Sequence, residues 1–234
     1  MTVAAGAGQQ SHPVGMIDTV KRVCAVLQHA HLPFALTGGF AAYARGASLS
    51  DHDVDFLIRP SDVEPVAAAL REDGIRVAQP PEDWLIKAYD GDVAVDLIHH
   101  PVGQPVTDAT LDDADILSVG GCHMPVISAN VLVEHKVLSM NAHRCDMEPV
   151  LELSRLLREQ VDWPRVRRET RGQPYAEAFM RLAELLDIGP ASPDAAPDAA
   201  PDTAQHTAQD PARDAGHDAS REAARAAVQK GVAS

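Results

Sequence analysis

Two aspartates separated by one residue open a short apolar segment, and no other feature of the sequence constrains the fold as strongly. Asp53-Val54-Asp55 leads into residues 54–59, whose β-branched and aromatic side chains predict a buried strand ending at Pro60. Side chains two positions apart on a strand point to the same face. Two unit charges ~4 Å apart repel by roughly 4 kcal/mol at an effective dielectric constant of 20. A proton or a cation must therefore lie between them, and a divalent metal ion meets this need.

A third carboxylate interrupts another apolar segment. Asp96 lies within Val93–Ile98, where an unpaired charge is costly. Asp53, Asp55 and Asp96 would supply only oxygen ligands, from neighbouring strands, which suits Mg²⁺ better than zinc. Magnesium held by carboxylates and shared with substrate phosphates serves phosphoryl and nucleotidyl transfer.

A pair of glycines, Gly38-Gly39, lies between a predicted strand at 34–37 and a predicted helix at 40–45. Without side chains at this point, backbone N–H groups and the helix N-terminus can approach phosphate oxygens. The glycine pair and the aspartates thus agree on a nucleoside triphosphate such as ATP.

The remaining apolar patterns predict the fold class. Asp90-Gly91 joins two apolar runs, at 84–89 and 93–98, as an antiparallel hairpin, and Gly120-Gly121 joins a second hairpin. Helical spacing predicts helices at 16–31, 61–72 with Ser61 as the cap, 130–141, 146–160, 163–170 and 175–186. We therefore expect an α/β (α+β) chain: a mixed sheet with flanking helices, followed by a C-terminal helical part.

Composition limits the class of protein. The chain has 234 residues and a net charge of −14, which weighs against a surface that binds nucleic acid everywhere. Cys24, Cys122 and Cys145 form no CxxC spacing, so neither a disulfide framework nor a zinc site is indicated. No signal peptide and no apolar run of roughly 20 residues is evident. We expect a cytoplasmic protein without membrane contact.

Domain boundaries follow from changes in composition. We expect a flexible N-terminus at 1–15, an α/β domain at 16–127 and a helical part at 128–189. An Ala/Pro/Asp-rich tail at 190–234 has almost no larger apolar residues, which predicts disorder.

The motifs together resemble the nucleotidyltransferase superfamily related to DNA polymerase β. Thr37-Gly38-Gly39-Phe40, thirteen residues later Asp53-Val54-Asp55-Phe56, and then Asp96 are similar to its glycine pair, DxD strand and third acidic residue. Phe40 stands where many members have Ser or Thr. The resemblance implies a polymerase-β-like fold, nucleotide contacts from Thr37, Gly38 and Gly39, and metal binding and catalysis by the three aspartates.

A second resemblance involves residues 134–148. Lys136 and Asp146 lie in segments similar to the Lys-containing and Arg-x-x-Asp helices of AbiEii-like toxin and antibiotic nucleotidyltransferases. This implies that Lys136 contacts the triphosphate and that Asp146 lies near the nucleotide or acceptor. The implied mechanism has two Mg²⁺ ions on Asp53 and Asp55, pyrophosphate leaving toward Lys136, and Asp96 orienting or deprotonating the acceptor hydroxyl.

Several alternatives stay open. The acceptor could be a tRNA end, a protein or a drug-sized molecule. A catalytically degenerate nucleotide-binding module is a second possibility, as is an interaction module with an antitoxin partner, and a helical half that only oligomerises is a third. Arginines concentrate in residues 155–181, as solvated helix faces or as a dock for an anionic acceptor. His99 and His100 should face opposite sides of a strand, which disfavours chelation by both.

Overall fold

The computed structural model describes residues 13–48 and 53–189, and these belong to one compact unit. The predicted tail and most of the predicted flexible N-terminus lie outside the described residues. Within the described ranges, no helix has the length and apolar character needed to cross a bilayer.

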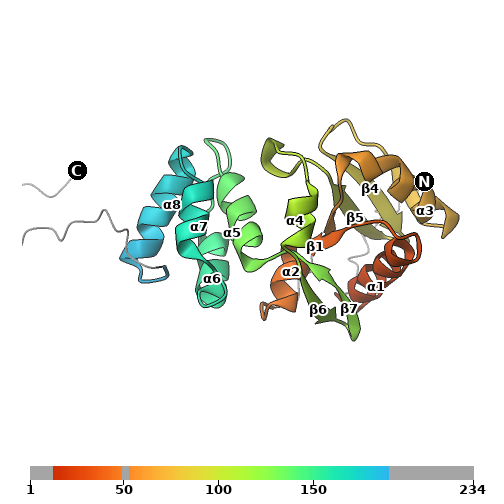
Figure 1. The fold of residues 1–234 in the computed structure, drawn as a ribbon, viewed down its shortest axis with the longest axis horizontal. Helices are drawn as coiled ribbons and strands as arrows, with labels where there is room; N and C mark the ends of the chain where they lie inside the picture. The colour runs from red at the N-terminus through yellow and green to blue at the C-terminus, as the bar shows by residue number, and fades with distance from the viewer. Residues whose placement is uncertain (1–12, 49–52, 190–234) are drawn as a thin grey trace, which may run out of the picture. The chain divides into compact units, whose positions relative to one another are not determined.

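A seven-stranded mixed sheet in the order β3-β4-β5-β2-β1-β7-β6 forms the α/β part of the described chain (Figure 1). The central strand β2 pairs parallel with β5 and antiparallel with β1, and β7 runs parallel to β1. The strands are β1 (Ala35–Thr37), β2 (Val54–Leu57), β3 (Arg76–Ala78), β4 (Leu85–Asp90), β5 (Val93–Ile98), β6 (Asp115–Val119) and β7 (Cys122–Val126). The predicted mixed sheet is confirmed.

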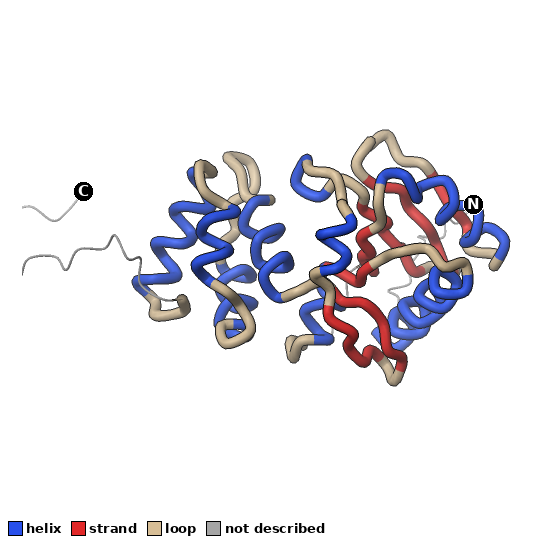
Figure 2. The backbone as a smooth tube through the Cα atoms, in the orientation of Figure 1, coloured by secondary structure: helices blue, strands red, loops and turns tan. Residues whose placement is uncertain are grey.

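Helices flank the sheet and then continue without strands, as Figure 2 shows for α5–α8. The helices are α1 (Pro13–His29), α2 (Gly38–Ala44), α3 (Val63–Glu72), α4 (Asp108–Asp112), α5 (Ala129–Leu138), α6 (Glu148–Leu157), α7 (Trp163–Glu169) and α8 (Pro174–Leu185). Short 3-10 turns lie at Pro60–Asp62 and Pro101–Gly103. The predicted helical second half is confirmed.

The central strands have one apolar face and one face that carries the polar groups. Along β5, Val95 and Leu97 are fully buried, and α1 packs against β2 and β5. Asp96 and Ile98, at the alternate positions, line a pocket on the opposite face. The apolar core thus holds the strands whose other face carries the aspartates.

Two local predictions are wrong. The β4–β5 turn is formed by Gly91-Asp92, because Asp90 pairs with Val93, and Gly91 has a left-handed φ of 60°. Ser61 does not cap α3: the chain first makes a 3-10 turn, and Arg59 Nε donates to Asp62 Oδ2 at 2.6 Å, so the Asp62 side chain makes no capping hydrogen bond either.

Some elements were not predicted or begin elsewhere. Helix α1 begins at Pro13, before the predicted start at Met16. Strand β3 has three residues, too short to show an alternating pattern. Helix α4 is a single turn held by a capping box, in which Thr107 and Thr110 bond each other's backbone N–H.

Candidate active site

Four side chains from four neighbouring strands stand in one row across the sheet. Strand register aligns Thr37 with Asp55, Asp55 with Asp96, and Asp96 with Lys87. Residues aligned on paired strands share one face of the sheet. The row therefore presents two adjacent carboxylates between a hydroxyl group and an ammonium group.

The surroundings of Asp55 shift its pKa strongly. Burial, the charge of Asp96 and the charge of Asp53 raise the pKa of Asp55 to about 7, while Lys136 and Lys87 act in the opposite direction. Asp53 is exposed and lies immediately before β2. Negative charge at the centre of the row is thus only partly compensated by the protein's own cations.

Gly38 is required by its contact with Asp55. Its φ is 62°, and a Cβ built at residue 38 would lie 2.0 Å from Oδ2 of Asp55 and 2.8 Å from its Cγ. The missing side chain therefore makes room for the carboxylate, in addition to leaving the backbone accessible. Gly39, the other member of the predicted pair, is in the first turn of α2 and is not among the pocket-lining residues.

Lys87 is a site residue that the sequence analysis missed. Its Nζ donates to Oδ1 of Asp96 at 2.6 Å. Burial lowers the pKa of Lys87. Its hydrogen bond to Asp96 and the charges of Asp96 and Asp53 raise the pKa by more than burial lowers it, so the net shift is upward. The misplaced hairpin turn hid this pair, because a turn at Asp90-Gly91 would align Lys87 with Ala94.

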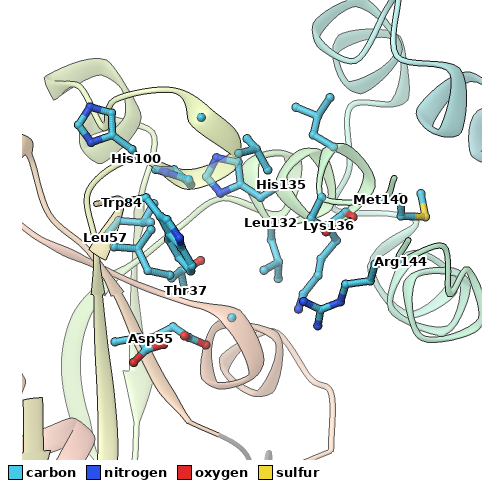
Figure 3. Close-up of a pocket in the computed structure, with 18 of the residues that line it drawn as sticks. Thr37, Asp55, Leu57, Trp84, His100, Leu132, His135, Lys136, Met140 and Arg144 are labelled. Carbon is cyan, nitrogen blue, oxygen red and sulfur yellow. Dashed lines mark hydrogen bonds between the residues drawn. The ribbon is translucent and has the colours of Figure 1, made fainter. Parts of the chain in front are cut away.

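A pocket of about 1180 Å³ lies over Thr37, Asp55 and Asp96 of the row, bounded by the sheet, α5 and the segment between α5 and α6. Lys136 and Arg144 also line this pocket, and in Figure 3 both side chains extend into it. Asp146 also lines the pocket, and its Oδ1 accepts a hydrogen bond from the N–H of Glu148 at 3.2 Å. Of the residues predicted for the site, the pocket brings together Thr37, Gly38, Asp53, Asp55, Asp96, Lys136 and Asp146.

The histidine pair does not follow the strand alternation that was expected. Strand β5 ends at Ile98, so the strand alternation does not extend to His99 and His100, and their Nδ1 atoms lie 2.6 Å apart. Burial and the neighbouring His100 lower the pKa of His99. In the described part of the chain, no three His, Cys, Asp or Glu side chains are grouped so that they could hold a metal ion.

Most arginines of the C-terminal helices pair with acidic residues of the same chain. Arg167 and Arg181 both pair with Glu184, while Arg158 and Arg168 each pair with the next residue. This internal neutralisation weakens the electrostatic case for a polyanionic acceptor at these helices.

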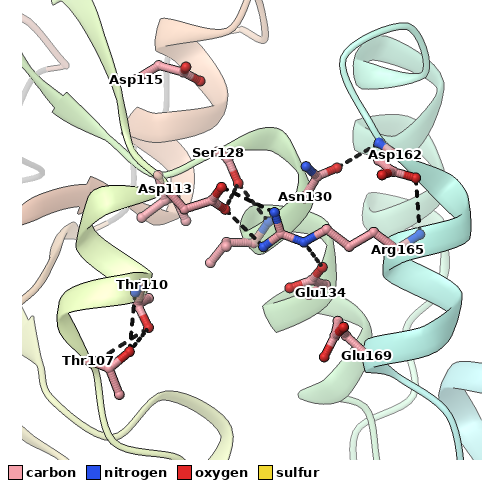
Figure 4. Close-up of polar contacts among 12 residues, drawn as sticks. Thr107, Thr110, Asp113, Asp115, Ser128, Asn130, Glu134, Asp162, Arg165 and Glu169 are labelled. Atoms are coloured by element: carbon pink, nitrogen blue, oxygen red, sulfur yellow. Dashed lines mark hydrogen bonds and ion pairs between the residues drawn. The ribbon is translucent and has the colours of Figure 1, made fainter.

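Arg165 joins α7 to two other parts of the chain (Figure 4). Its Nη2 pairs with Oδ2 of Asp113 at 2.9 Å and its Nε with Oε1 of Glu134 at 3.2 Å. Ser128 Oγ also donates to Asp113, at 2.7 Å. Burial raises the pKa of Asp113, but hydrogen bonds from Arg165 and Ser128 lower it below its usual range. The network holds α5, which carries Lys136, against the segment that precedes β6.

The mixed sheet with its row of carboxylates has the fold of polymerase-β-like nucleotidyltransferases. The crystal structure of ANT(2")-Ia in complex with adenylyl-2"-tobramycin is similar, with a TM-score of 0.50 and 16% identity, over 72% of this chain and 98% of that one. The chain belongs to a family described as uncharacterised nucleotidyltransferases, whose model matches residues 10–187. It is therefore a transferase that uses a nucleoside triphosphate.

Two further solved structures have lower TM-scores and lower identity to this chain. A nucleotidyltransferase-like antigen from Paracoccidioides brasiliensis is 13% identical, with a TM-score of 0.49, over 74% of this chain and 88% of its own. Lincomycin-bound LnuA, a lincosamide adenylyltransferase, is 12% identical, with a TM-score of 0.44, over 59% of this chain and 94% of its own. No curated protein matches the sequence.

Proposed function

We propose that the protein transfers a nucleoside monophosphate from a nucleoside triphosphate to a hydroxyl group of a small-molecule acceptor, with Mg²⁺ and with release of pyrophosphate. The alignment of Asp55 with Asp96, beside Gly38 and beneath a pocket that also contains Lys136, carries this proposal. These residues bring together carboxylates, a backbone that a phosphate can approach without meeting a side chain, and a cation.

The donor set fits magnesium. Asp53, Asp55 and Asp96 offer only oxygen atoms, and burial together with the negative charges of Asp96 and Asp53 raises the pKa of Asp55. Magnesium is commonly held by one or two carboxylates together with substrate phosphates, so it does not require a closed group of three protein ligands. Asp53 and Asp55 would hold the metal, with Asp96 beside it. The metal would supply charge stabilisation at the transferred phosphate.

The chain's own residues would bind and orient the substrates. Lys136, a mobile point charge, would contact the departing pyrophosphate together with the N–H groups of Gly38 and Gly39. Thr37 and Asp146 would contact the nucleotide. Asp96 would accept a hydrogen bond from the acceptor hydroxyl and take its proton.

A small acceptor is favoured over RNA. The arginines that could attract a polyanion are largely paired within the chain, and the net charge of −14 repels one. We further propose a cytoplasmic location, since all three cysteines are free.

Pyrophosphate release from ATP in the presence of pooled small hydroxyl compounds tests the proposal. Asp96→Asn should lower the acceptor-dependent rate by about 10²–10⁴-fold if Asp96 is the general base. Asp18→Asn, which removes an exposed carboxylate paired with Lys21 at 2.9 Å, is the matched control and should retain the rate. Equal rates in Asp96→Asn and wild type would exclude the proposed role of Asp96.

One observation favours a nucleotide-binding module without transfer activity: Lys87 bonds directly to Asp96. Calorimetry of ATP with and without Mg²⁺ separates the two functions. Metal-dependent binding that Asp53→Asn abolishes supports the transferase, whereas binding unaffected by metal and by the substitution supports the module.

A further inference from the structure

One end of the pocket is built mainly from rings and apolar side chains. It lies beyond the carboxyl ends of β2 and β5, where Leu57, Ile98, Trp84, His100 and Val102 line the wall. Leu132 and His135 of α5 line the pocket as well, and Figure 3 shows His135 on the same side as His100 and Trp84. Burial lowers the pKa of His135 to about 4, so its ring is uncharged at neutral pH.

Trp84 is presented to this end by a fixed stretch of backbone. Its side chain is 40% exposed although it is one of the largest apolar groups of the described chain. Its carbonyl oxygen accepts hydrogen bonds from the N–H groups of His99, at 3.0 Å, and His100, at 3.1 Å. These bonds join the residue before β4 to the two residues after β5, so the paired strands hold the backbone of Trp84 in place. A rigid aromatic surface open to a pocket is suited to stacking on a ligand ring.

Val102 extends the same wall from a strained turn. Its φ of 45° and ψ of 34° are left-handed, which is unfavourable for a β-branched residue. The turn is closed by hydrogen bonds from Gln104 N–H to Pro101 O and from Val106 N–H to His99 O, both 2.9 Å. Val102 stays 38% exposed at the pocket. Strain maintained by surrounding bonds in a ligand pocket is typical of functional positions.

We propose that this end binds the acceptor, and that the acceptor is a small hydroxyl compound with a flat or apolar ring and at most one positive charge. The inference rests on the proposed transfer to a hydroxyl at Asp96. Ile98 is the next residue on the same face of β5, about 6.6 Å along the strand. The body of a molecule whose hydroxyl meets Asp96 therefore extends over Ile98 toward Trp84 and His100.

The distribution of charged residues in the pocket assigns the nucleotide and the acceptor to different ends. Lys136, whose charge acts on Asp55, and Arg144 are cations of the pocket lining that can meet phosphates. Asn141 and Asp146 line the pocket from the same α5–α6 segment as Arg144 and offer polar edges to a nucleobase. Around Trp84, Asp83 is the lining carboxylate. A polycation such as an aminoglycoside needs several carboxylates to replace its hydration, so this end disfavours it.

Intrinsic fluorescence of the full-length protein tests the inference without turnover, because the second tryptophan, Trp163, is 4% exposed. The probes are α,β-methylene-ATP with Mg²⁺, phenyl β-glucoside, lincomycin and tobramycin. Phenyl glucoside and lincomycin should change the Trp84 signal, whereas the nucleotide and tobramycin should not. Trp84→Phe serves to assign the signal.

Affinities measured by calorimetry provide the second readout. Trp84→Ala should weaken binding of the ring compounds about tenfold, as expected for loss of a stacking partner, while Trp84→Phe keeps most of the affinity and nucleotide affinity is unchanged. Loss of nucleotide affinity in Trp84→Ala would mean that this end holds the nucleobase and would overturn the inference. Binding of tobramycin as tight as that of the ring compounds, or binding of none of them, would also overturn it. The transferase proposal fails separately if the ring compounds bind in a way that depends on Trp84 but no nucleotidyl transfer occurs.

Discussion

The carboxylate of Asp55 occupies the space that a side chain at Gly38 would need. A Cβ at residue 38 would lie 2.0 Å from Oδ2 of Asp55, and Thr37, the preceding residue, aligns with Asp55 across the β1–β2 pair. The glycine and the aspartate of the two motifs are thus coupled by direct packing, although Asp55 follows Gly38 by seventeen positions in the sequence.

Gly38→Ala should therefore displace Asp55 and abolish nucleotidyl transfer. The backbone is left-handed there, which by itself costs about 1–2 kcal/mol for a residue with a Cβ, and the clash adds to this. Gly91→Ala is the matched control, since Gly91 has a φ of 60° and a Cβ added there would meet nothing within 4 Å. Both variants should show a lowered Tm, but Gly91→Ala should retain activity. Full activity in Gly38→Ala would contradict the coupling.

Stability of the metal-free protein should fall as pH rises through the titration of Asp55. Its pKa is about 7 in the folded protein against an ordinary value of 3.8. Between these values the folded chain holds a proton that the unfolded chain has released, so the free energy of unfolding decreases with pH and levels off above pH 7. Thermal melts in EDTA should show this decrease in wild type and not in Asp55→Asn. If the Tm values of wild type and Asp55→Asn differ by the same amount at every pH, the prediction is contradicted.

Lys87→Met should destabilise the metal-free protein and increase its response to magnesium. Asp96 is buried, and loss of its hydrogen bond from Lys87 should cost about 1–3 kcal/mol. Magnesium then has no competing ammonium group, so the Mg²⁺-induced rise in Tm should exceed that of wild type. Lys21→Met, which breaks an exposed pair with Asp18, controls for loss of a lysine. An unchanged Tm in EDTA together with an unchanged magnesium response would refute the competition.

Arg165→Ala should lower stability far more than removal of a neighbouring arginine. It leaves Asp113 and the buried Glu134 without their cation, at an expected cost of about 3 kcal/mol. Arg168→Ala removes an exposed pair with Glu169, at 3.0 Å, and should change the free energy of unfolding by less than about 1 kcal/mol. Urea denaturation of both variants measures the difference. Equal losses would show that the Arg165 network does not anchor α5.

Sequence reasoning named seven of the residues that line the pocket, because the aspartates and glycines carry strong local signals. Asp55 is fixed by strand alternation, Asp53 lies immediately before the same strand, and Asp96 stands out as a charge in an apolar strand. The clustering of Lys136 and Asp146 in the same pocket agrees with the family resemblance. The catalytic and binding roles of all these residues remain predictions.

Features that depend on register or on tertiary packing could not be predicted. Lys87 was missed because a turn shifted by one residue changes every partner in the hairpin. Gly38 was assigned to phosphate approach alone, since only the folded chain brings Asp55 against it. The sequence did not predict that Trp84 and Val102 line the pocket, because these loop residues become part of a pocket only when α5 packs over them.

Transfer of label from ATP tests the central claim most directly. The protein is incubated with Mg²⁺, pooled small hydroxyl compounds and ATP labelled at either the α- or the γ-phosphate. We predict that α-label appears in the acceptor and γ-label in pyrophosphate, and that both products are lost in Asp53→Asn and Asp55→Asn. Transfer of γ-label to the acceptor, or undiminished transfer of α-label by these variants, would contradict nucleotidyl transfer at this row of carboxylates.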